Sequence, residues 1–146
     1  MIRIKIANPY DFPLDCSDLK AAAIAVFEGE NVASAHVILA FVDDAHIHRL
    51  NKQFLNHDEP TDVLTFPYSD PDTSKIEGEV VIGYEVAAGN ALERGHPLAW
   101  ELQLDVIHGC LHLCGYTDHT DEAARVMRQL ERKYLAVRGL PNISGD

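Results

Sequence analysis

The chain begins with a strict alternation of apolar and polar residues. Ile2, Ile4 and Ile6 alternate with Arg3 and Lys5, and this period of two is typical of a strand with one buried face. Three later segments are also predicted to be strands, because they are rich in apolar and β-branched residues. These segments are residues 35–42, 62–66 and 78–84.

Helices are predicted where apolar residues recur three or four positions apart behind a residue that can cap a helix. The expected N-caps are Ser17 or Asp18, Asp43 or Asp44, and Thr120. The first helix runs to about residue 28, and two more are expected over residues 85–94 and 98–113. Behind the second cap, Ile47, Leu50 and Phe54 fall on one helix face, which indicates that this face packs on the core.

The segment 98–113 differs from the other helices because it is apolar nearly all round. A helix of this kind is buried on every side, so we expect it at the centre of the molecule. About four strands and about five helices predict an α+β fold with a mixed sheet. At roughly 150 residues per domain, the 146 residues favour one domain over residues 1–146.

The chain is acidic, with 12 Lys and Arg, 23 Asp and Glu, and a net charge of −11. Such a surface repels phosphate backbones at long range, which excludes a generic nucleic-acid coat protein but not a nuclease with a local basic groove. Three cysteines do not match a secreted disulfide framework. No signal peptide or membrane-length apolar run is visible, so we expect a cytoplasmic protein without a membrane partner.

The end of the helix predicted over residues 98–113 carries the pattern that indicates chemistry. His108 and His112 are four residues apart, so their imidazoles lie one turn apart on the same face. Gly115 would let the chain turn back, so that Asp118 or His119 completes the coordination of one metal ion. Such a set suits zinc, and three ligands leave a position open for water. The pattern predicts a catalytic metal site rather than a closed structural one.

Three residues near the two histidines distinguish this predicted site from other kinds of metal site. Gly109 stands where a zinc protease of the H-E-x-x-H type has its general-base Glu, so a protease is disfavoured. Close packing against a strand and passage of substrate would each explain this glycine. Cys110 and Cys114 lie about 200° and 240° around the helix from His108. They are therefore expected to point into the core as small hydrophobic residues rather than to bind the metal.

Three motifs carry a resemblance to a known family. Residues 108–116 match H-G-x-L-H-L-x-G-Y without a gap. The second motif is L-N followed by P-T-D-V-L-S-F-P, and residues 50–51 and 60–67 match it with one mild replacement. The third motif is a G-D-[IV]-x-I strand, and residues 78–82 match it, also with one mild replacement. The three motifs lie within about residues 37–135 and follow the order that they have in one known family. The chain therefore resembles that family, the YbeY family of bacterial endoribonucleases, also called rRNA maturation factors.

The resemblance implies a single-domain α+β fold in which His108 and His112 bind one Zn²⁺ ion, although other divalent transition metals suit the same ligands. It further implies a metal-dependent endoribonuclease specific for single-stranded RNA, with roles in 16S rRNA 3′-end maturation and ribosome quality control. RNA and the ribosome or its proteins would then be the partners. The reaction uses a metal-activated water, and no catalytic residue beyond that water is predicted.

The third ligand departs from the family pattern. Asp118 occupies the position of the third family histidine, and His119 follows directly. Spacing therefore favours Asp118, whereas the ligand preference of zinc favours an imidazole. We take His119 as the third ligand and Asp118 as the alternative.

The phosphate contact is a second departure. The family carries an Arg between the two parts of its second motif, and Leu55 stands there in this chain. Lys52 or His57 would have to replace the contact, although neither reproduces the fork of a guanidinium. A local basic groove is a further hypothesis, formed if the first strand and second helix flank the site; its residues are Arg3, Lys5, Arg49 and Lys52.

Two other functions are compatible with the same residues. One is a non-catalytic ribosome-assembly factor in which the metal holds a loop, and the other is a metallohydrolase with another substrate, such as a small phosphoester. A structural metal contributes folding energy, so metal removal would unfold the first of these. The second would turn over a model diester but not RNA.

Overall fold

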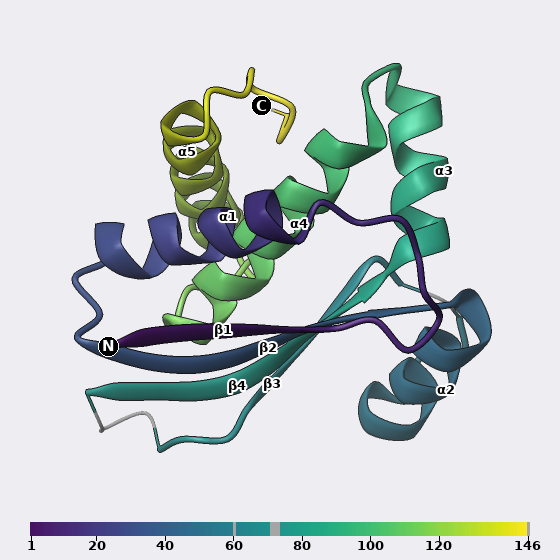
Figure 1. The fold of residues 1–146 in the computed structure, drawn as a ribbon, viewed down its shortest axis with the longest axis horizontal. Helices are drawn as coiled ribbons and strands as arrows, with labels where there is room; N and C mark the ends of the chain where they lie inside the picture. Colours follow the sequence, from purple (N-terminus) through teal and green to yellow (C-terminus); the bar gives the residue numbers. More distant parts are fainter. Residues whose placement is uncertain (60, 71–73, 146) are drawn as a thin grey trace.

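A mixed four-stranded sheet organises the part of the chain that the structure describes (Figure 1). The computed structural model describes residues 1–59, 61–70 and 74–145. Across the sheet the order is β1 (Ile2–Ala7), β2 (Ser34–Val42), β4 (Lys75–Gly83) and β3 (Val63–Pro67). The β1–β2 and β2–β4 pairs are parallel, and β3 is antiparallel to β4. Parallel neighbours need long crossover connections, which the helices supply.

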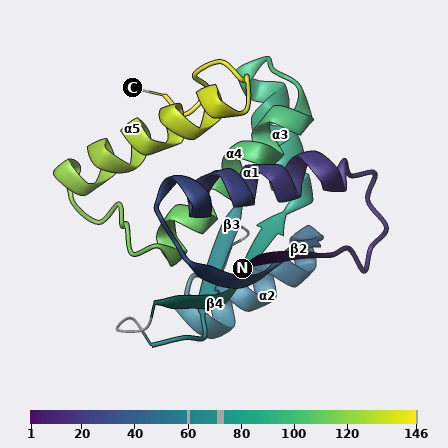
Figure 2. The ribbon, with the colours of Figure 1, turned by 60° about the vertical axis from the view of Figure 1, so that its left-hand side comes forward.

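The helices cover the two faces of the sheet unequally. On one side lie α1 (Cys16–Gly29), α3 (Tyr84–Arg94), α4 (Leu98–Leu113) and α5 (Asp121–Val137), and on the other lies α2 (Asp44–Leu55) (Figures 1 and 2). The predicted α+β class, with a mixed sheet of four strands and five helices among the described residues, is confirmed.

The first helix begins earlier than predicted. It starts at Cys16, and its N-cap is Asp15, whose Oδ1 accepts the backbone N–H of Asp18 at 3.1 Å. The expectation of Ser17 or Asp18 as the cap was wrong because both residues lie inside the first turn. There the carboxylate of Asp18 faces the positive end of the helix dipole, which is also favourable.

Two other predicted caps are confirmed. Asp43 Oδ1 accepts the backbone N–H of His46 at 2.9 Å, and Thr120 Oγ1 accepts that of Ala123 at 3.0 Å. Each cap satisfies one of the N–H groups that a helix start leaves without a partner.

The strand predicted over residues 78–84 is longer at its start, because β4 begins at Lys75, and shorter at its end, because Tyr84 begins α3. The connection predicted over residues 68–75 includes residues 71–73, which lie outside the described residues, as does Pro60 of the second motif.

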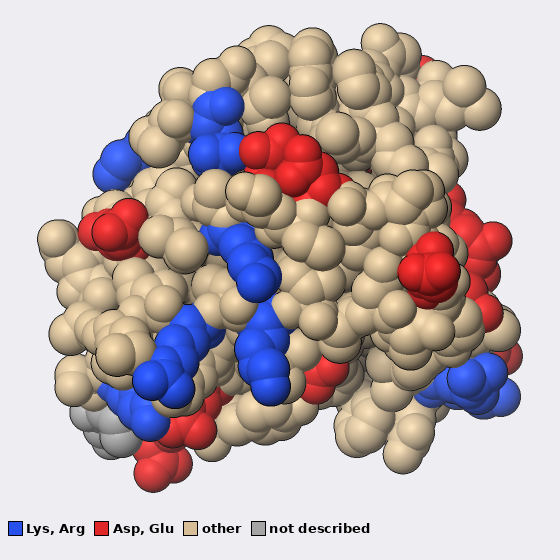
Figure 3. All heavy atoms as spheres, viewed as in Figure 1, with Lys and Arg blue, Asp and Glu red and all other residues tan. Residues whose placement is uncertain are grey.

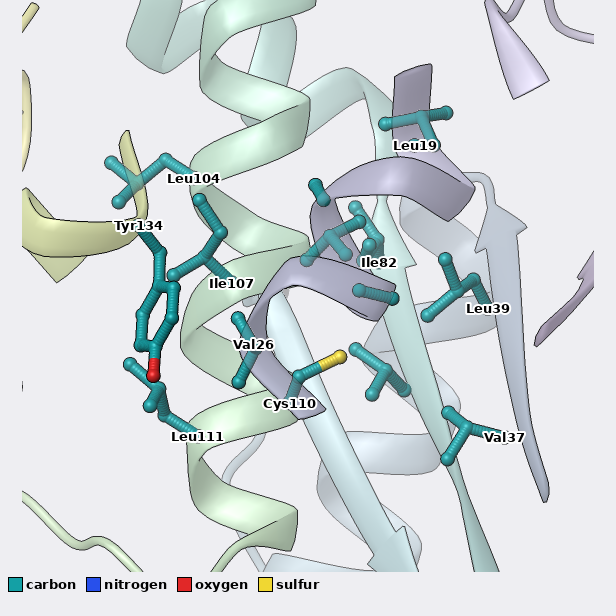
Figure 4. Close-up of a cluster of buried hydrophobic side chains, with 14 of the residues drawn as sticks. Leu19, Val26, Val37, Leu39, Ile82, Leu104, Ile107, Cys110, Leu111 and Tyr134 are labelled. Carbon is teal, nitrogen blue, oxygen red and sulfur yellow. The ribbon is translucent and has the colours of Figure 1, made fainter. Parts of the chain in front are cut away.

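The predicted central position of α4 is confirmed. Every residue of the helix from 101 to 107 is buried, and the helix contacts α1, α3 and α5 as well as β3 and β4. Figure 4 shows how the side chains interlock: Ile107, Cys110 and Leu111 lie beside Val26, Ile82 and Tyr134. Because interiors are close-packed, this core fixes the position of α4 and of the side chains at its exposed end.

The opposite face of the sheet is only partly covered. Under α2, Ile47 packs on Ala40, Val42, Leu64 and Val81. A hollow in this face is lined by residues of β1, β2 and β4 and by Tyr68, among them Arg3, Lys5 and His36. Most of the Lys and Arg side chains seen in Figure 3 lie in its left half, where Figure 1 places β1, α1 and α5.

None of the described helices has the length and apolar character needed to span a bilayer.

Candidate metal centre

The last turns of α4 bring the two predicted histidines together. His108 and His112 are half-buried, and their ring centroids lie 4.5 Å apart with the ring planes at 83°. Their Nε2 atoms are 2.9 Å apart. The convergence follows from the spacing of four residues in a regular helix.

The outer nitrogen of each imidazole has its own hydrogen-bond acceptor. His108 Nδ1 lies 2.6 Å from Glu131 Oε2, and His112 Nδ1 lies 2.9 Å from the carbonyl oxygen of Tyr116. Neither acceptor carries a hydrogen, so each Nδ1 donates, and the neutral rings present lone pairs at Nε2. Two nitrogen lone pairs that face each other at 2.9 Å repel each other. The arrangement is favourable only when both lone pairs interact with a cation or share a proton. Metal-binding histidines are oriented in this way by an outer acceptor.

The two imidazoles differ in their affinity for a proton. Burial opposes the charged form of His108, but the hydrogen bond and the charge of Glu131 outweigh it, so the pKa of His108 is raised. Burial and the neighbouring charge of His108 lower the pKa of His112. A proton on His108 Nε2, donated to His112 Nε2, therefore satisfies the pair without a metal and competes with one.

Asp118 completes a group of three ligand atoms. Its Oδ2 lies 3.8 Å from His108 Nε2 and 4.0 Å from His112 Nε2. Zinc bonds of 2.0–2.1 Å in a tetrahedral site separate ligand atoms by about 3.3–3.4 Å, and the three distances lie on both sides of that value. Among the described residues, no other three His, Cys, Asp or Glu side chains bring their ligand atoms within 4.8 Å of one another.

His119 is not part of this group, although the ligand preference of zinc favoured it in the sequence. It is exposed, and its charge contributes to lowering the pKa of His112. The predicted turn is present, with Gly115 at a φ of +103° directly after the helix. After this turn, Asp118, which lies two residues beyond Tyr116, is the residue that faces the imidazoles, and His119 is not.

The cysteines lie where the helix geometry predicts. Cys110 is fully buried in the core, and Cys114 is half-buried at its edge. Burial raises the pKa of Cys110 well above the ordinary thiol value, and burial followed by the charge of Glu30 raises that of Cys114 to about 12. Both sulfurs therefore stay protonated at neutral pH, whereas a metal binds the thiolate.

Gly109 is explained by close packing rather than by passage of substrate. It is buried, and a Cβ atom at this position would overlap Val80 Cγ1 of β4. The same atom would lie 3.2 Å from Val80 Cγ2 and 3.3 Å from Val63 Cγ1 of β3. The glycine lets α4 approach the sheet closely beside the two histidines.

A half-buried carboxylate, that of Glu30, connects both outer hydrogen bonds to the rest of the fold. Glu30, which follows α1, accepts hydrogen bonds from the hydroxyls of Tyr116, at 2.6 Å, and Tyr134. Tyr116 supplies the carbonyl that orients His112, and Tyr134 lies on α5, the helix that carries Glu131. Glu30 thus holds the turn and the helix that orient the imidazoles.

Sequence reasoning missed Glu131 and Glu30. Glu131 had a local signal, because it interrupts the buried stripe of α5 formed with Met127, Tyr134 and Leu135. An acid in an apolar stripe is costly unless it has a partner, which here is His108. Glu30 had no such signal, since its partners lie far along the chain.

A cavity of about 350 Å³ adjoins His108. Its charged and polar lining comprises Asp62, Arg94, Glu101, Asp105, Asp118, Arg128, Glu131 and Ser144. The four basic residues of the predicted groove do not line it: Arg3 and Lys5 lie on the opposite face of the sheet, and Arg49 and Lys52 lie on α2. Leu55 is exposed at the end of α2. Among the described residues, the guanidinium groups that line this cavity are those of Arg94 and Arg128.

Comparison with known proteins agrees with the motifs. A family model described as "Endoribonuclease YbeY" matches residues 13–139. Proteins named "Endoribonuclease YbeY" from Rhodopirellula baltica and Carboxydothermus hydrogenoformans are 40% and 38% identical to this chain. The matches cover 85% and 81% of this chain, and 64% and 82% of those proteins.

A solved structure gives the same result for the fold. The solution structure of TM1509 from Thermotoga maritima matches 100% of this chain and 96% of its own chain, with a TM-score of 0.63 and 29% identity. The family model, which matches most of the chain, and the relatives at more than a third identity establish the relationship. The chain belongs to the YbeY family of endoribonucleases.

Proposed function

We propose that this protein is a metal-dependent endoribonuclease that cleaves single-stranded RNA. The observation that carries the proposal is the facing pair of Nε2 atoms, 2.9 Å apart, on imidazoles whose Nδ1 atoms are both engaged. The relatives named as endoribonucleases direct the choice of substrate. We further propose action in the cytoplasm on 16S rRNA 3′ ends and in ribosome quality control, with the ribosome as partner.

We propose His108, His112 and Asp118 as the ligands of one Zn²⁺ ion. Two imidazoles and one carboxylate are a donor set that zinc accepts, and a three-ligand set leaves a coordination position open. When bound, the ion lowers the pKa of a coordinated water towards neutrality and offsets charge on the phosphoryl oxygens. Glu131 and the carbonyl of Tyr116 keep the imidazoles oriented, and Arg128 on the cavity wall is placed to bind a phosphate.

The proposal is tested by cleavage of a single-stranded rRNA fragment by the protein stripped of metal and reloaded with one equivalent of zinc. We expect no cleavage by the stripped protein, full recovery with zinc, and little cleavage of the same fragment annealed to its complement. Circular dichroism should show that the stripped protein stays folded, because its core is formed without the site.

Other outcomes would support the two remaining functions. If the zinc-loaded protein leaves RNA intact and stripping the metal unfolds it, the metal is structural and an assembly factor is the better description. Turnover of a model phosphodiester without cleavage of RNA would indicate a different substrate. Either result contradicts the proposal.

The third ligand is tested by a matched pair of neighbouring variants. Asp118→Ala is expected to weaken zinc binding by at least about tenfold, since it removes the oxygen that faces both imidazoles. His119→Ala should bind zinc as the wild type does, because His119 is exposed outside the group. Competition with a chromophoric chelator measures both affinities. Loss of zinc in His119→Ala with retention in Asp118→Ala would reverse the assignment.

A further inference from the structure

The cavity beside His108 contains more carboxylates than its cations neutralise. Glu101 is paired with Arg94, at 2.8 Å, and with His96, and Glu131 is paired with His108. In the described part of the chain, these pairs account for two of the five carboxylates that line the cavity. The other three are Asp62, Asp105 and Asp118.

Asp105 is the feature that points to a ligand. It is only 3% exposed, it lines the cavity, and its Oδ2 is buried without a hydrogen-bond partner among the residues that the structure describes. A buried, uncompensated carboxylate is strongly unfavourable. Burial, followed by the charge of Asp62, raises the pKa of Asp105 well above its ordinary value. The charge of Arg94 acts in the opposite direction but does not outweigh these effects, so the carboxyl group of Asp105 is only partly compensated.

Asp62 and Asp118 face the same space. Among the described residues, the carboxylate of Asp62 accepts hydrogen bonds from the backbone N–H of Val63 and the hydroxyl of Thr61, and both of these go to Oδ1. Asp62 and His108 line the same cavity. Asp118 lines the cavity and lies within 4.0 Å of both imidazoles, so the cavity is continuous with the histidine site.

We propose that this cavity binds a second divalent cation, held by Asp62 and Asp105 with Asp118 between it and the histidine site. The oxygen donors suit a hard cation such as Mg²⁺ or Mn²⁺, whereas the imidazoles suit zinc. Mg²⁺ keeps several waters and is typically held by one or two carboxylates together with a substrate phosphate. Among the described residues no second set of three converging ligand atoms is present, so water and a substrate phosphate would have to complete the coordination of this cation.

The second cation would answer the electrostatic problem that the sequence raises. RNA must approach a chain of net charge −11 that lacks the family Arg at position 55, through a cavity lined by carboxylates. A cation at Asp105 neutralises that cavity and supplies a phosphate ligand. Two cations on one phosphodiester are a recurring arrangement in nucleases. The inference rests on the proposed function for its substrate but not for its binding site.

The proposal is tested with protein that holds one equivalent of zinc, titrated with Mn²⁺ while free Mn²⁺ is followed by electron paramagnetic resonance. The wild type is expected to bind one Mn²⁺ beyond the zinc. Asp105→Asn, which keeps the shape of the side chain, should weaken Mn²⁺ binding by at least about tenfold and retain zinc. Asp62→Asn serves as a second variant, and Glu93→Gln, which removes an exposed carboxylate of α3, should leave Mn²⁺ binding unchanged.

Two results would overturn the second site. In one, the zinc-loaded wild type takes up no Mn²⁺; in the other, the variants at positions 62 and 105 bind it as the wild type does. Tighter binding of inorganic phosphate by Asp105→Asn, with no Mn²⁺ bound by the wild type, would identify an anion site served by Arg128 instead. Cleavage of RNA by the zinc-loaded wild type without Mn²⁺ uptake would leave the proposed function intact and remove only the second site.

Discussion

Replacement of His112 by Ala is expected to abolish RNA cleavage, with a loss of at least about 10³-fold in kcat/KM. The variant removes one of the two Nε2 atoms that face each other at 2.9 Å, so the remaining ligands no longer surround an ion. Retention of the fold is expected, because the side chain of His112 is half-buried outside the core cluster and its own hydrogen bond is to the adjacent turn. Cleavage of a single-stranded rRNA fragment and zinc content measure the two effects.

His48→Ala is the matched control for this prediction. His48 lies on α2 and contacts Asp58 at an exposed position, so its removal should leave both zinc content and cleavage unchanged. Contaminating ribonuclease is the main experimental hazard, and equal cleavage by the wild type and His112→Ala would attribute the activity to it. Full zinc content in His112→Ala would separately refute the ligand role.

The fold could be predicted because its local patterns agree with its packing. The alternation of residues 2–6 determines which face of the strand is buried, and the nearly all-apolar segment 98–113 indicates a helix buried on every side. Both elements lie as predicted. Helix starts were less certain where several polar residues stand together. Asp15, rather than Ser17 or Asp18, caps α1, since any of the three could accept the hydrogen bond and tertiary packing selects the start.

The site was predictable only as far as helix geometry extends. The convergence of His108 and His112 follows from their spacing in a regular helix. The third residue lies beyond Gly115, where the chain leaves the helix and no periodicity determines which side chain turns inward. Asp118, not His119, reaches the imidazoles. The orienting acid Glu131 comes from α5, and a contact between helices cannot be derived from the pattern of either.

Gly109 shows how packing and the site are connected. The residue follows His108, and the sequence left close packing and substrate passage both open. The structure places it against Val80 and Val63, on two strands of the sheet. Val80 is fully buried, and its β-branched side chain has little rotamer freedom. The contact therefore determines the distance between α4 and the sheet.

Gly109→Val is expected to destabilise the protein by about 3 kcal/mol, since added methyl groups in a close-packed core force shifts of side chains and backbone. Gly109→Ala should cost less, about 1–2 kcal/mol, because the better helix propensity of Ala returns about 1 kcal/mol. Urea unfolding monitored by circular dichroism measures both variants. Zinc affinity should fall in parallel, because α4 moves away from β4 beside a ligand.

The control for helix propensity is Gly89→Ala on α3, where an added Cβ would meet no heavy atom of the described residues within 4 Å, apart from its chain neighbours and its own helix backbone. This change should stabilise the protein by up to about 1 kcal/mol. In a Val80→Ala background, Gly109→Ala should lose most of its cost, because the methyl group then occupies the vacated space. If Gly109→Ala is as stabilising as Gly89→Ala in the wild-type background, the helix does not depend on this contact. Substrate passage would then again be the better explanation for the glycine.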